Sequence, residues 1–358
     1  MTRGLVYAEP GAELVVEEIV LDPPGPHEVQ VRIEACGLCH TDVHVVETDG
    51  WGMDFPILLG HEGAGTVEEI GSGVTSVEPG DRVVAAWRAP CGKCRSCVRG
   101  DPRRCSSALR AKPRAHRASD GAVLSSVLRC GTLADRAIVH EACAVKVPEE
   151  LAIEQAALLA CGFSTGAGAA LWATPVHEGA SVAVIGCGGV GLAVVQGAKL
   201  AGAERIVAVD VAAEKLDAAR ALGATDVVDA SAADPIAQVK ELTRGVDFAF
   251  SAVGAASGLD QAVRMCGYGG VATLVGVPSA GTTLGVDLYR NLFGPKVGIA
   301  VTHGGDTIPQ EDFPFLAQAA LDGRLDLARF VTATIPLEAA PAALEQLGRD
   351  GIRTVVRL

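Results

Sequence analysis

The stretch from Ser181 to Asp210, SVAVIGCGGVGLAVVQGAKLAGAERIVAVD, limits the possible folds of this chain more than any other. It begins with an apolar run at Val182–Ile185, passes through a glycine turn into a helix-like pattern, and ends in a second apolar run. The glycines form G-x-G-x-x-G directly after the first run. A strand, glycine turn, helix and strand in this order are typical of a doubly wound parallel sheet.

The glycine turn also predicts a dinucleotide site. Gly186, Gly188 and Gly191 let the backbone approach a pyrophosphate, which then lies at the unpaired N–H groups of the helix N-terminus. Asp210 ends the next strand, where its carboxylate can accept both ribose hydroxyls and would repel a 2′-phosphate. No Arg follows in residues 211–213. The motif therefore favours NAD over NADP.

The alternation of strands and helices continues beyond Asp210. Further strands are expected near Thr225–Asp229, Val246–Phe250 and Gly270–Val277. Residues 162–300 are thus predicted to form one doubly wound α/β domain. The tail, 301–358, ends in the strand-like sequence TVVRL and is expected to rejoin the first domain.

Residues 1–161 have a different character. Glu28 to Ala35 alternates between apolar and polar side chains, which predicts a half-buried strand with Glu28 on its polar side. Turn sequences at 22–26, 71–73 and 78–81 separate such strands. A small, mostly β domain is therefore expected. The later segment 154–173, EQAALLACGFSTGAGAALWA, reads as a helix.

Four cysteines lie close together in CGKCRSCVRGDPRRC, residues 91–105. In a reducing compartment such clustered thiols indicate metal binding, and four thiolates close a structural zinc site. An iron–sulfur cluster also uses four thiolates, but the bacterial ferredoxin run has its fourth Cys after three residues and followed by Pro. We therefore predict a structural zinc lobe with four ligands, Cys91, Cys94, Cys97 and Cys105.

A second metal site is indicated in the segment 35–65. Cys39 and His61 are ligand types that zinc favours, and Thr41 and His44 between them are able to pass a proton outward. One thiol and one imidazole are half of a site, so a further ligand must come from elsewhere, and we favour Cys161. Taken alone, Cys39 and His61 also fit a buried small hydrophobe and a satisfied loop histidine.

Residues 102–117 carry six basic side chains and no acid: Arg103, Arg104, Arg110, Lys112, Arg114 and Arg117. This basic loop could steer an anionic substrate or bind a partner subunit. A solvated loop is the simpler interpretation of such a charge run.

The chain has 358 residues, eleven cysteines and a formal net charge of −13. The charge argues against nucleic acid or an anionic membrane as partner. No apolar run approaches the ~18 residues of a membrane span, and no leader pattern opens the chain. The cysteines are too sparse for a secreted disulfide scaffold. A cytoplasmic protein is expected.

The motifs GLCHTDVH, GHE, the four-cysteine lobe, CGFSTG and GCGGVG occur in this order over nearly the whole chain. Together they resemble the zinc-dependent medium-chain alcohol dehydrogenases. The resemblance implies a GroES-like β-rich catalytic domain and a Rossmann domain. It also implies NAD, one catalytic and one structural zinc per subunit, a small-molecule alcohol or aldehyde as substrate, and a homodimer or homotetramer.

The resemblance assigns roles to individual residues. Cys39, His61 and Cys161 match the catalytic zinc ligands, and Glu62 is an acid beside that zinc or a transient ligand. Asp42 matches the carboxylate that orients the ligating His, and Thr41 and His44 match the proton relay. Substrate-pocket positions fall at Trp87 and Leu133. Residues matched to cofactor contacts are His40, Thr165, Gly186, Gly188, Gly189, Val190, Gly191, Asp210, Lys215, Val275 and Arg353. The remaining cysteines, Cys36, Cys130, Cys143, Cys187 and Cys266, are expected to serve packing.

The implied reaction is hydride transfer between an alcohol (primary, bulky or aromatic) and NAD, giving the aldehyde or ketone. The lobe sequence WRAPCGKCRSCVRGDPRRC also resembles mycothiol-dependent formaldehyde dehydrogenases, which oxidise an S-(hydroxymethyl) thiol adduct. A catalytically silent NAD-binding protein on the same fold is the third alternative.

Overall fold

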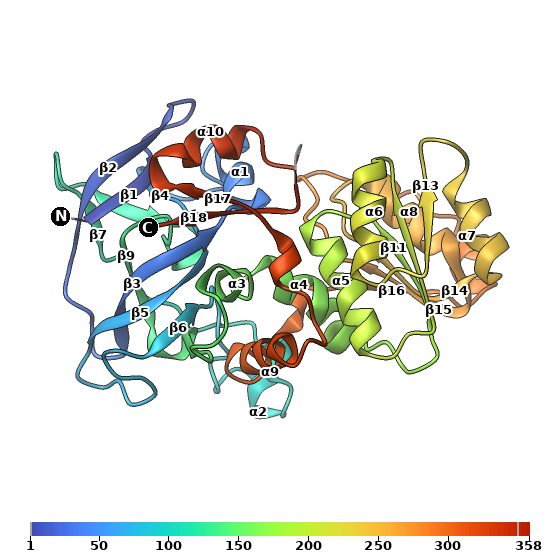
Figure 1. Cartoon of the computed structure of the whole chain (residues 1–358), viewed down its shortest axis with the longest axis horizontal. Helices are drawn as coiled ribbons and strands as arrows, with labels where there is room; N and C mark the ends of the chain where they lie inside the picture. Colours follow the sequence, from blue (N-terminus) through green and yellow to red (C-terminus); the bar gives the residue numbers. More distant parts are fainter. Residues whose placement is uncertain (1, 349–350) are drawn as a thin grey trace. The chain divides into compact units, whose positions relative to one another are not determined.

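A computed structural model describes residues 2–348 and 351–358. The chain divides into two compact units, of which the first comprises 1–161 and 308–358 and the second comprises 162–307. The second unit extends to Thr307 instead of ending at 300. Figure 1 shows the strands and helices of each unit coloured along the chain.

The first unit contains a small closed barrel and a larger sheet. The barrel strands, in spatial order, are β1 (Thr2–Tyr7), β2 (Leu14–Leu21), β7 (Ala115–Arg117), β8 (Val123–Ser126) and β4 (Ile57–Leu58). The sheet runs β10 (Ala144–Lys146), β6 (Arg82–Ala85), β5 (Glu62–Ile70), β3 (Glu28–Gly37), β18 (Arg353–Arg357) and β17 (Val331–Pro336), with β9 (Arg136–His140) paired to β3. The tail thus contributes two strands to this sheet, and β18 lies antiparallel to β3.

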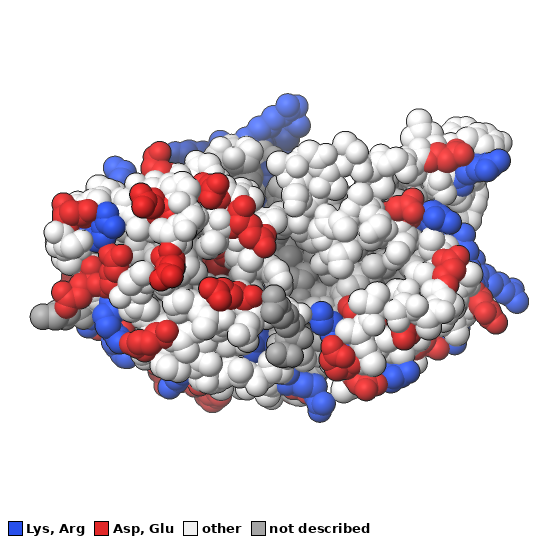
Figure 2. All heavy atoms as spheres, turned by 90° about the horizontal axis from the view of Figure 1, so that it is seen from above, with Lys and Arg blue, Asp and Glu red and all other residues white. Residues whose placement is uncertain are grey.

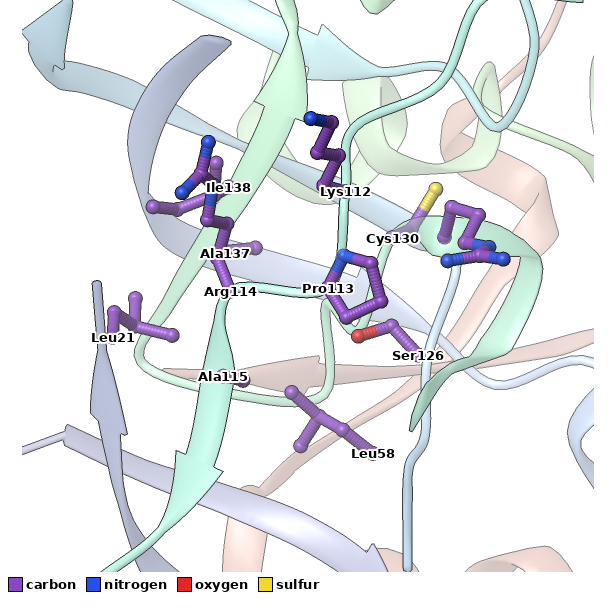
Figure 3. Close-up of a pocket in the computed structure, with 11 residues that line it drawn as sticks. Leu21, Leu58, Lys112, Pro113, Arg114, Ala115, Ser126, Cys130, Ala137 and Ile138 are labelled. Atoms are coloured by element: carbon purple, nitrogen blue, oxygen red, sulfur yellow. The ribbon is translucent and has the colours of Figure 1, made fainter. Parts of the chain in front are cut away.

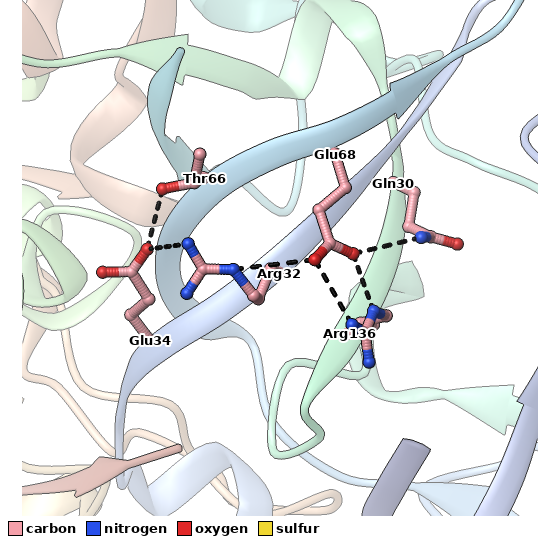
Figure 4. A network of polar contacts seen from close by, with 6 residues as sticks. All are labelled: Gln30, Arg32, Glu34, Thr66, Glu68 and Arg136. Carbon is pink, nitrogen blue, oxygen red and sulfur yellow. Dashed lines mark hydrogen bonds and ion pairs between the residues drawn. The ribbon is translucent and has the colours of Figure 1, made fainter. Parts of the chain in front are cut away.

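Helices of four to 13 residues connect these strands. They are α1 (His40–Glu47), α2 (Arg95–Val98), α3 (Ile153–Leu158), α9 (Pro309–Leu321) and α10 (Ala340–Glu345). Strand β3 confirms the half-buried strand, since Val29, Val31, Ile33 and Ala35 are buried. On its outer side, polar side chains from three strands interlock, as Figure 4 shows. There Glu68 accepts from Arg136 at 2.6 Å.

The second unit is a six-stranded sheet with every neighbouring pair parallel, which confirms the predicted doubly wound fold. Its strand order is β13 (Asp226–Asp229), β12 (Arg205–Asp210), β11 (Ser181–Ile185), β14 (Val246–Ser251), β15 (Cys266–Leu274) and β16 (Gly298–Val301). Its helices are α4 (Gly162–Gly168), α5 (Gly189–Leu200), α6 (Ala213–Leu222), α7 (Pro235–Thr243) and α8 (Ala256–Met265). The central strands are buried apolar runs, as a sheet covered on both faces requires.

The prediction of one helix over 154–173 is wrong. The segment forms α3, a break at 159–161, α4, and a π-helical turn at Ala169–Ala173. Cys161, which is half-buried, lies at the end of this break, directly before α4, instead of inside a helix. Three glycines, Gly162, Gly166 and Gly168, and the neighbouring Ser164 and Thr165 weaken the helix around it.

Glu28 differs from the other polar side chains of strand β3, because its side chain is buried. Its carboxylate accepts from the Arg114 guanidinium at 2.7 Å and from the N–H groups of Lys112 and Gly25 at 2.9 Å each. These contacts tie the basic loop to the sheet. A buried carboxylate is tolerated only with such partners.

We expect Glu28→Gln to lower the free energy of unfolding at pH 7 by roughly 1.5–3 kcal/mol, the range for hydrogen bonds to charged groups. Burial alone would raise the pKa of Glu28, but the N–H groups of Lys112 and Gly25 and the Arg114 cation lower it below its usual value. The stabilisation is therefore full above the unfolded-state pKa of about 4.3 and is lost as pH falls through the lower folded-state pKa.

Urea unfolding at neutral and acid pH measures this effect. The difference between the wild type and Glu28→Gln should shrink below about pH 4. Glu18→Gln on the exposed side of β2 is the control and should leave stability unchanged. Equal stability of Glu28→Gln and the wild type at pH 7 would contradict the interpretation.

Candidate metal centres and cofactor site

Three turns of the first unit bring the metal-ligand candidates together. Cys39 is the N-cap of α1, directly after β3, and His61 immediately precedes β5. Cys161 lies at the break after α3. Gly60, beside His61, has φ +93°, and a Cβ there would lie 2.1 Å from the backbone nitrogen of Leu133. A glycine is therefore required for the turn that presents the histidine.

Cys39, His61, Glu62 and Cys161 each offer a donor atom, and these atoms all lie within 4.8 Å of one another. The first three side chains are buried. Two sulfurs, a ring nitrogen and a carboxylate oxygen at this spacing suit a tetrahedral zinc. The prediction of a metal site built on Cys39, His61 and Cys161 thus has a matching cluster, and Glu62 is part of it.

The imidazole of His61 also fits a metal ligand. Neither ring nitrogen has a hydrogen-bond partner among the described residues, although the ring is fully buried. Its Nδ1 lies 3.4 Å from Oδ2 of Asp42, whose Oδ1 accepts from the N–H of Gly60 at 2.9 Å. Asp42 thereby orients the ring and leaves Nε2 for the cluster, which is the usual arrangement behind a metal-bound histidine.

Mutual contacts shift the pKa values of these groups. The Cys161 thiol, as a hydrogen-bond donor, and then the charge of His61 lower the pKa of Cys39 well below its usual value, against the effect of burial. Burial alone would lower the pKa of His61, but Asp42 and Cys39 raise it well above its usual value. The same contact with Cys39 raises the pKa of Cys161. A bound cation would take the deprotonated forms of these ligands and displace their protons.

Arg353, from the far end of the chain, lies beside this cluster. Its guanidinium is buried, donates to the backbone oxygen of Leu38 at 3.0 Å and lies 3.6 Å from Oε1 of Glu62. Burial alone would lower the pKa of Arg353, but Glu62 and the sulfur groups of Cys39 and Cys161 raise it. A contact of Arg353 with a cofactor pyrophosphate stays a prediction.

The expected four-cysteine lobe is confirmed as a second cluster. The four sulfurs lie within 4.8 Å of one another, and N–H groups of Cys91 and Cys94 donate to lobe sulfurs at 3.3 Å. Gly92 and Gly100 have positive φ and supply the sharp turns between ligands. Backbone donors lower the pKa of Cys94 to about 5, whereas burial and its thiol neighbours raise that of Cys97 to about 12. Four thiols this close suit a closed structural zinc site.

The basic loop is mostly neutralised. Four of its cations pair with carboxylates: Arg103 with Asp312, Arg104 with Asp101, Arg114 with Glu28 and Arg117 with Asp120. The end of the loop forms the barrel strand β7, and Lys112 and Arg114 just before it border the pocket of Figure 3. None of the predicted site residues lines that pocket. Across the face in Figure 2, basic and acidic side chains are interspersed.

The second unit contains the predicted glycine turn between β11 and α5. A Cβ at Gly191 would lie 1.8 Å from the carbonyl oxygen of Gly186, so only glycine fits. Gly188 is the N-cap of α5 and Gly189 its first residue, which leaves the first N–H groups of the helix for an anion. Asp210 at the end of β12 accepts from the N–H groups of Cys187, Val211 and Ala212 at 2.7–3.0 Å. Its carboxylate is therefore held in one orientation.

Other predicted contact residues differ in exposure. Thr165 and Val275 are buried, and Val190 and Lys215 are half-buried. In the first unit, His40 is exposed, Thr41 and Trp87 are half-buried, and Leu133 is fully buried. The imidazole of His44 lies 6.2 Å from the indole of Trp51, a residue that the sequence reasoning passed over. The exposed position of Trp51 in the turn after α1 could not be predicted from the residue type alone. The five cysteines assigned to packing are buried: Cys36, Cys130, Cys143, Cys187 and Cys266.

Comparison with known proteins identifies the class. Residues 25–149 match the alcohol dehydrogenase GroES-like domain, and residues 189–320 match the zinc-binding dehydrogenase domain. The chain belongs to the zinc-dependent medium-chain alcohol dehydrogenase family, whose members bind NAD(P). Both the predicted fold class and the prediction of one catalytic and one structural zinc site are confirmed.

Individual relatives cover the whole chain. An S-(hydroxymethyl)glutathione dehydrogenase of Photobacterium damsela subsp. piscicida is 36% identical over 368 residues, which is 99% of each chain. An alcohol dehydrogenase zinc-binding domain protein from Burkholderia ambifaria has a similar structure, with a TM-score of 0.94 and 34% identity over 100% of this chain and 98% of that one. The structure of benzyl alcohol dehydrogenase from Acinetobacter calcoaceticus is also similar, with a TM-score of 0.91 and 31% sequence identity. The match covers 100% of this chain and 99% of that one.

We expect the purified protein to hold two zinc ions per chain, and Cys161→Ser and Cys97→Ser to lose one each, because each change removes one thiolate from a different cluster. Metal analysis against protein concentration measures the content. Cys266→Ser replaces a buried thiol outside both clusters and should retain both ions. Full zinc content in both ligand variants would contradict the assignment.

Proposed function

We propose that this protein is an NAD-dependent zinc alcohol dehydrogenase (EC 1.1.1.-) that converts a primary alcohol to its aldehyde. The observation that carries the proposal is the buried cluster of Cys39, His61, Glu62 and Cys161 in a chain that also has a dinucleotide-binding turn. A catalytic zinc needs protein ligands and one position for substrate. In this cluster Glu62 would leave the zinc when substrate binds, because its carboxylate is attracted to the Arg353 guanidinium 3.6 Å away.

Zinc bound there would act as a Lewis acid that lowers the pKa of the alcohol, and NAD would accept the hydride. The chain's own part is to hold the reactants and to move the proton. Thr41 and His44 lie one turn apart on α1, which begins at the metal cluster. His44 is partly exposed and lies 3.7 Å from Glu47, so a proton passed through the Thr41 hydroxyl can leave to solvent.

For the substrate, we favour a bulky or aromatic primary alcohol. The similar structure named benzyl alcohol dehydrogenase supports this choice. The proposed pocket residues Trp87 and Leu133 are large and apolar, although Leu133 is fully buried in this structure.

An S-(hydroxymethyl) thiol adduct is the second candidate. The relatives named S-(hydroxymethyl)glutathione dehydrogenase favour it, at 34–36% identity. The notion that the basic loop captures the thiol's anionic groups has less support, because four of its six cations already pair with carboxylates. A mycothiol adduct belongs to the same reaction class.

NAD is the proposed cofactor over NADP. The oriented carboxylate of Asp210 would repel a 2′-phosphate, and Val211 follows it in place of an Arg. The structure of a zinc-binding dehydrogenase from Sinorhizobium meliloti, 25% identical, contains NADP. The choice between NAD and NADP therefore has to be argued from the residues of each chain and not from the fold.

A panel assay tests the proposal by the absorbance of the reduced cofactor. We expect turnover of benzyl alcohol and longer primary alcohols with NAD, no thiol requirement, and kcat/KM with NADP at least about 100-fold lower. The last figure corresponds to roughly 2.7 kcal/mol of lost cofactor binding. Turnover only with formaldehyde plus glutathione or mycothiol would move the assignment to the thiol adduct. A retained nucleotide with no zinc and no turnover would favour a silent binding protein.

We further propose a homo-oligomer joined through the second unit. Strand β16 is an edge of the six-stranded sheet, and large apolar side chains on and near it are exposed: Tyr268, Val277, Leu288, Tyr289, Phe293, Ile299 and Val301. Free backbone groups on an edge strand and an exposed apolar surface both favour association with a second copy. A homodimer is the simplest outcome of such self-pairing, and a homotetramer is a dimer of dimers.

We expect the wild type to sediment as a dimer or tetramer, and Ile299→Lys to shift it toward the monomer, because a charge on the edge opposes strand pairing. Analytical ultracentrifugation measures the mass. Val15→Lys, which alters an equally exposed valine of the barrel, is the control and should leave the mass unchanged. A wild-type monomer would contradict the proposal.

The two thiolate-rich clusters require reduced cysteines, which the cytoplasm supplies, and we propose that compartment. Among the described residues no helix is both long and apolar enough to cross a bilayer.

A further inference from the structure

One ion pair joins the four-cysteine lobe to the segment where the chain re-enters the first unit. Arg103 lies in the single helical turn Pro102–Arg104, just before the ligand Cys105. Its two terminal nitrogens contact both carboxylate oxygens of Asp312 at 2.6 and 3.1 Å. Such two-point contacts between guanidinium and carboxylate are the strong and geometrically specific kind.

The carboxylate of Asp312 is buried and has a second task. Oδ2 also accepts from the N–H of Ile308 at 2.6 Å, which closes the first turn of α9. Ile308 is the first residue of the returning segment, directly after the second unit ends at Thr307. The same carboxylate therefore holds the start of α9 and receives the cation of the lobe. In the described part of the chain, Arg103 is its one ion-pair partner.

The lobe itself depends on its ligands for order. Between Cys91 and Cys105 the backbone forms only a four-residue helix and a three-residue turn. Gly92 with positive φ precedes the helix, and Gly100 with positive φ separates the helix from the turn. A single helical turn of this length has little stability of its own. The metal that joins Cys97 to Cys105 would therefore also fix the turn that carries Arg103.

We infer that the Arg103–Asp312 pair couples the four-cysteine lobe to the start of α9, so that metal in the lobe and the first turn of α9 stabilise each other. Loss of the metal frees the turn, removes the cation from a buried carboxylate and weakens the Ile308 cap. Removing one partner from a buried pair is costly because the other charge is left uncompensated. The coupling is thermodynamic and must act in both directions.

The test measures zinc release from the lobe in variants of Arg103 and Asp312, which leave all four ligands in place. Asp312→Asn and Arg103→Gln should each speed release to a chromophoric chelator by at least about five-fold, the lower end of typical coupling. The rate is followed in the whole protein and in Cys161→Ser, where the remaining zinc is expected in the lobe. Arg104→Gln is the matched control, since Arg104 is the neighbouring cation and pairs with the exposed Asp101, and it should change the rate less than two-fold.

A double variant and hydrogen exchange separate coupling from local damage. Because both side chains act through one contact, Arg103→Gln combined with Asp312→Asn should release zinc no faster than the worse single variant. Amide exchange over 308–316 should accelerate when the lobe zinc is removed, and also in zinc-loaded Arg103→Gln. Arg103→Lys keeps the charge without the two-point contact, so its rate of zinc release should lie between those of the wild type and Arg103→Gln. This milder variant keeps the test decisive if Arg103→Gln or Asp312→Asn folds poorly.

Faster exchange in α9 with unchanged zinc release would overturn the coupling, because a local cap would explain it. Additive effects in the double variant would overturn it as well. Neither result would bear on alcohol turnover, so the proposed function stands or falls by its own assay.

Discussion

Two thiols, an imidazole and a carboxylate whose donor atoms lie within 4.8 Å of one another are costly to bury together without a cation to join them. This constraint explains much of the first unit. A glycine at position 60 leaves room for Leu133 in the turn that presents His61. The break after α3 places Cys161 between two helices, where its sulfur reaches the cluster. Asp42 supplies a negative charge behind the imidazole. The protein stabilises a local arrangement that is unfavourable without metal, and the surrounding β framework bears that cost.

The two metal clusters differ in how far apart their ligands lie in the sequence. In the lobe all four ligands come from fifteen consecutive residues, 91–105, so the loop can close around its metal without help from distant strands. The cluster of Cys39, His61 and Cys161 instead draws on three separated segments and on Arg353 from a fourth. A site assembled from distant segments is rigid only when the whole unit is folded, which suits a place where reactants must be held in register.

The sequence predicted what short spacing controls and missed what depends on distant partners. The lobe and the glycine turn could be read directly, because their ligands or N–H groups come from one short stretch. Cys161 was assigned through resemblance, since no spacing rule links it to Cys39. The burial of Glu28 was not predicted, because strand alternation cannot reveal an Arg114 partner from a distant loop. The helix around Cys161 was predicted as unbroken because hydrophobic periodicity does not detect a short break at a functional residue.

Strand β18 has a consequence for the order in which the molecule is made. Arg353 begins that strand and lies beside Glu62, and the strand pairs with β3 next to the metal cluster. During synthesis the second unit emerges between these two parts of the chain. At ~5–20 residues per second, the nascent β3 edge stays unpaired for many seconds until β18 arrives. Zinc capture at the cluster with its full set of neighbours is thus a late event in biogenesis, whereas the lobe can acquire its ion while the ribosome is still translating.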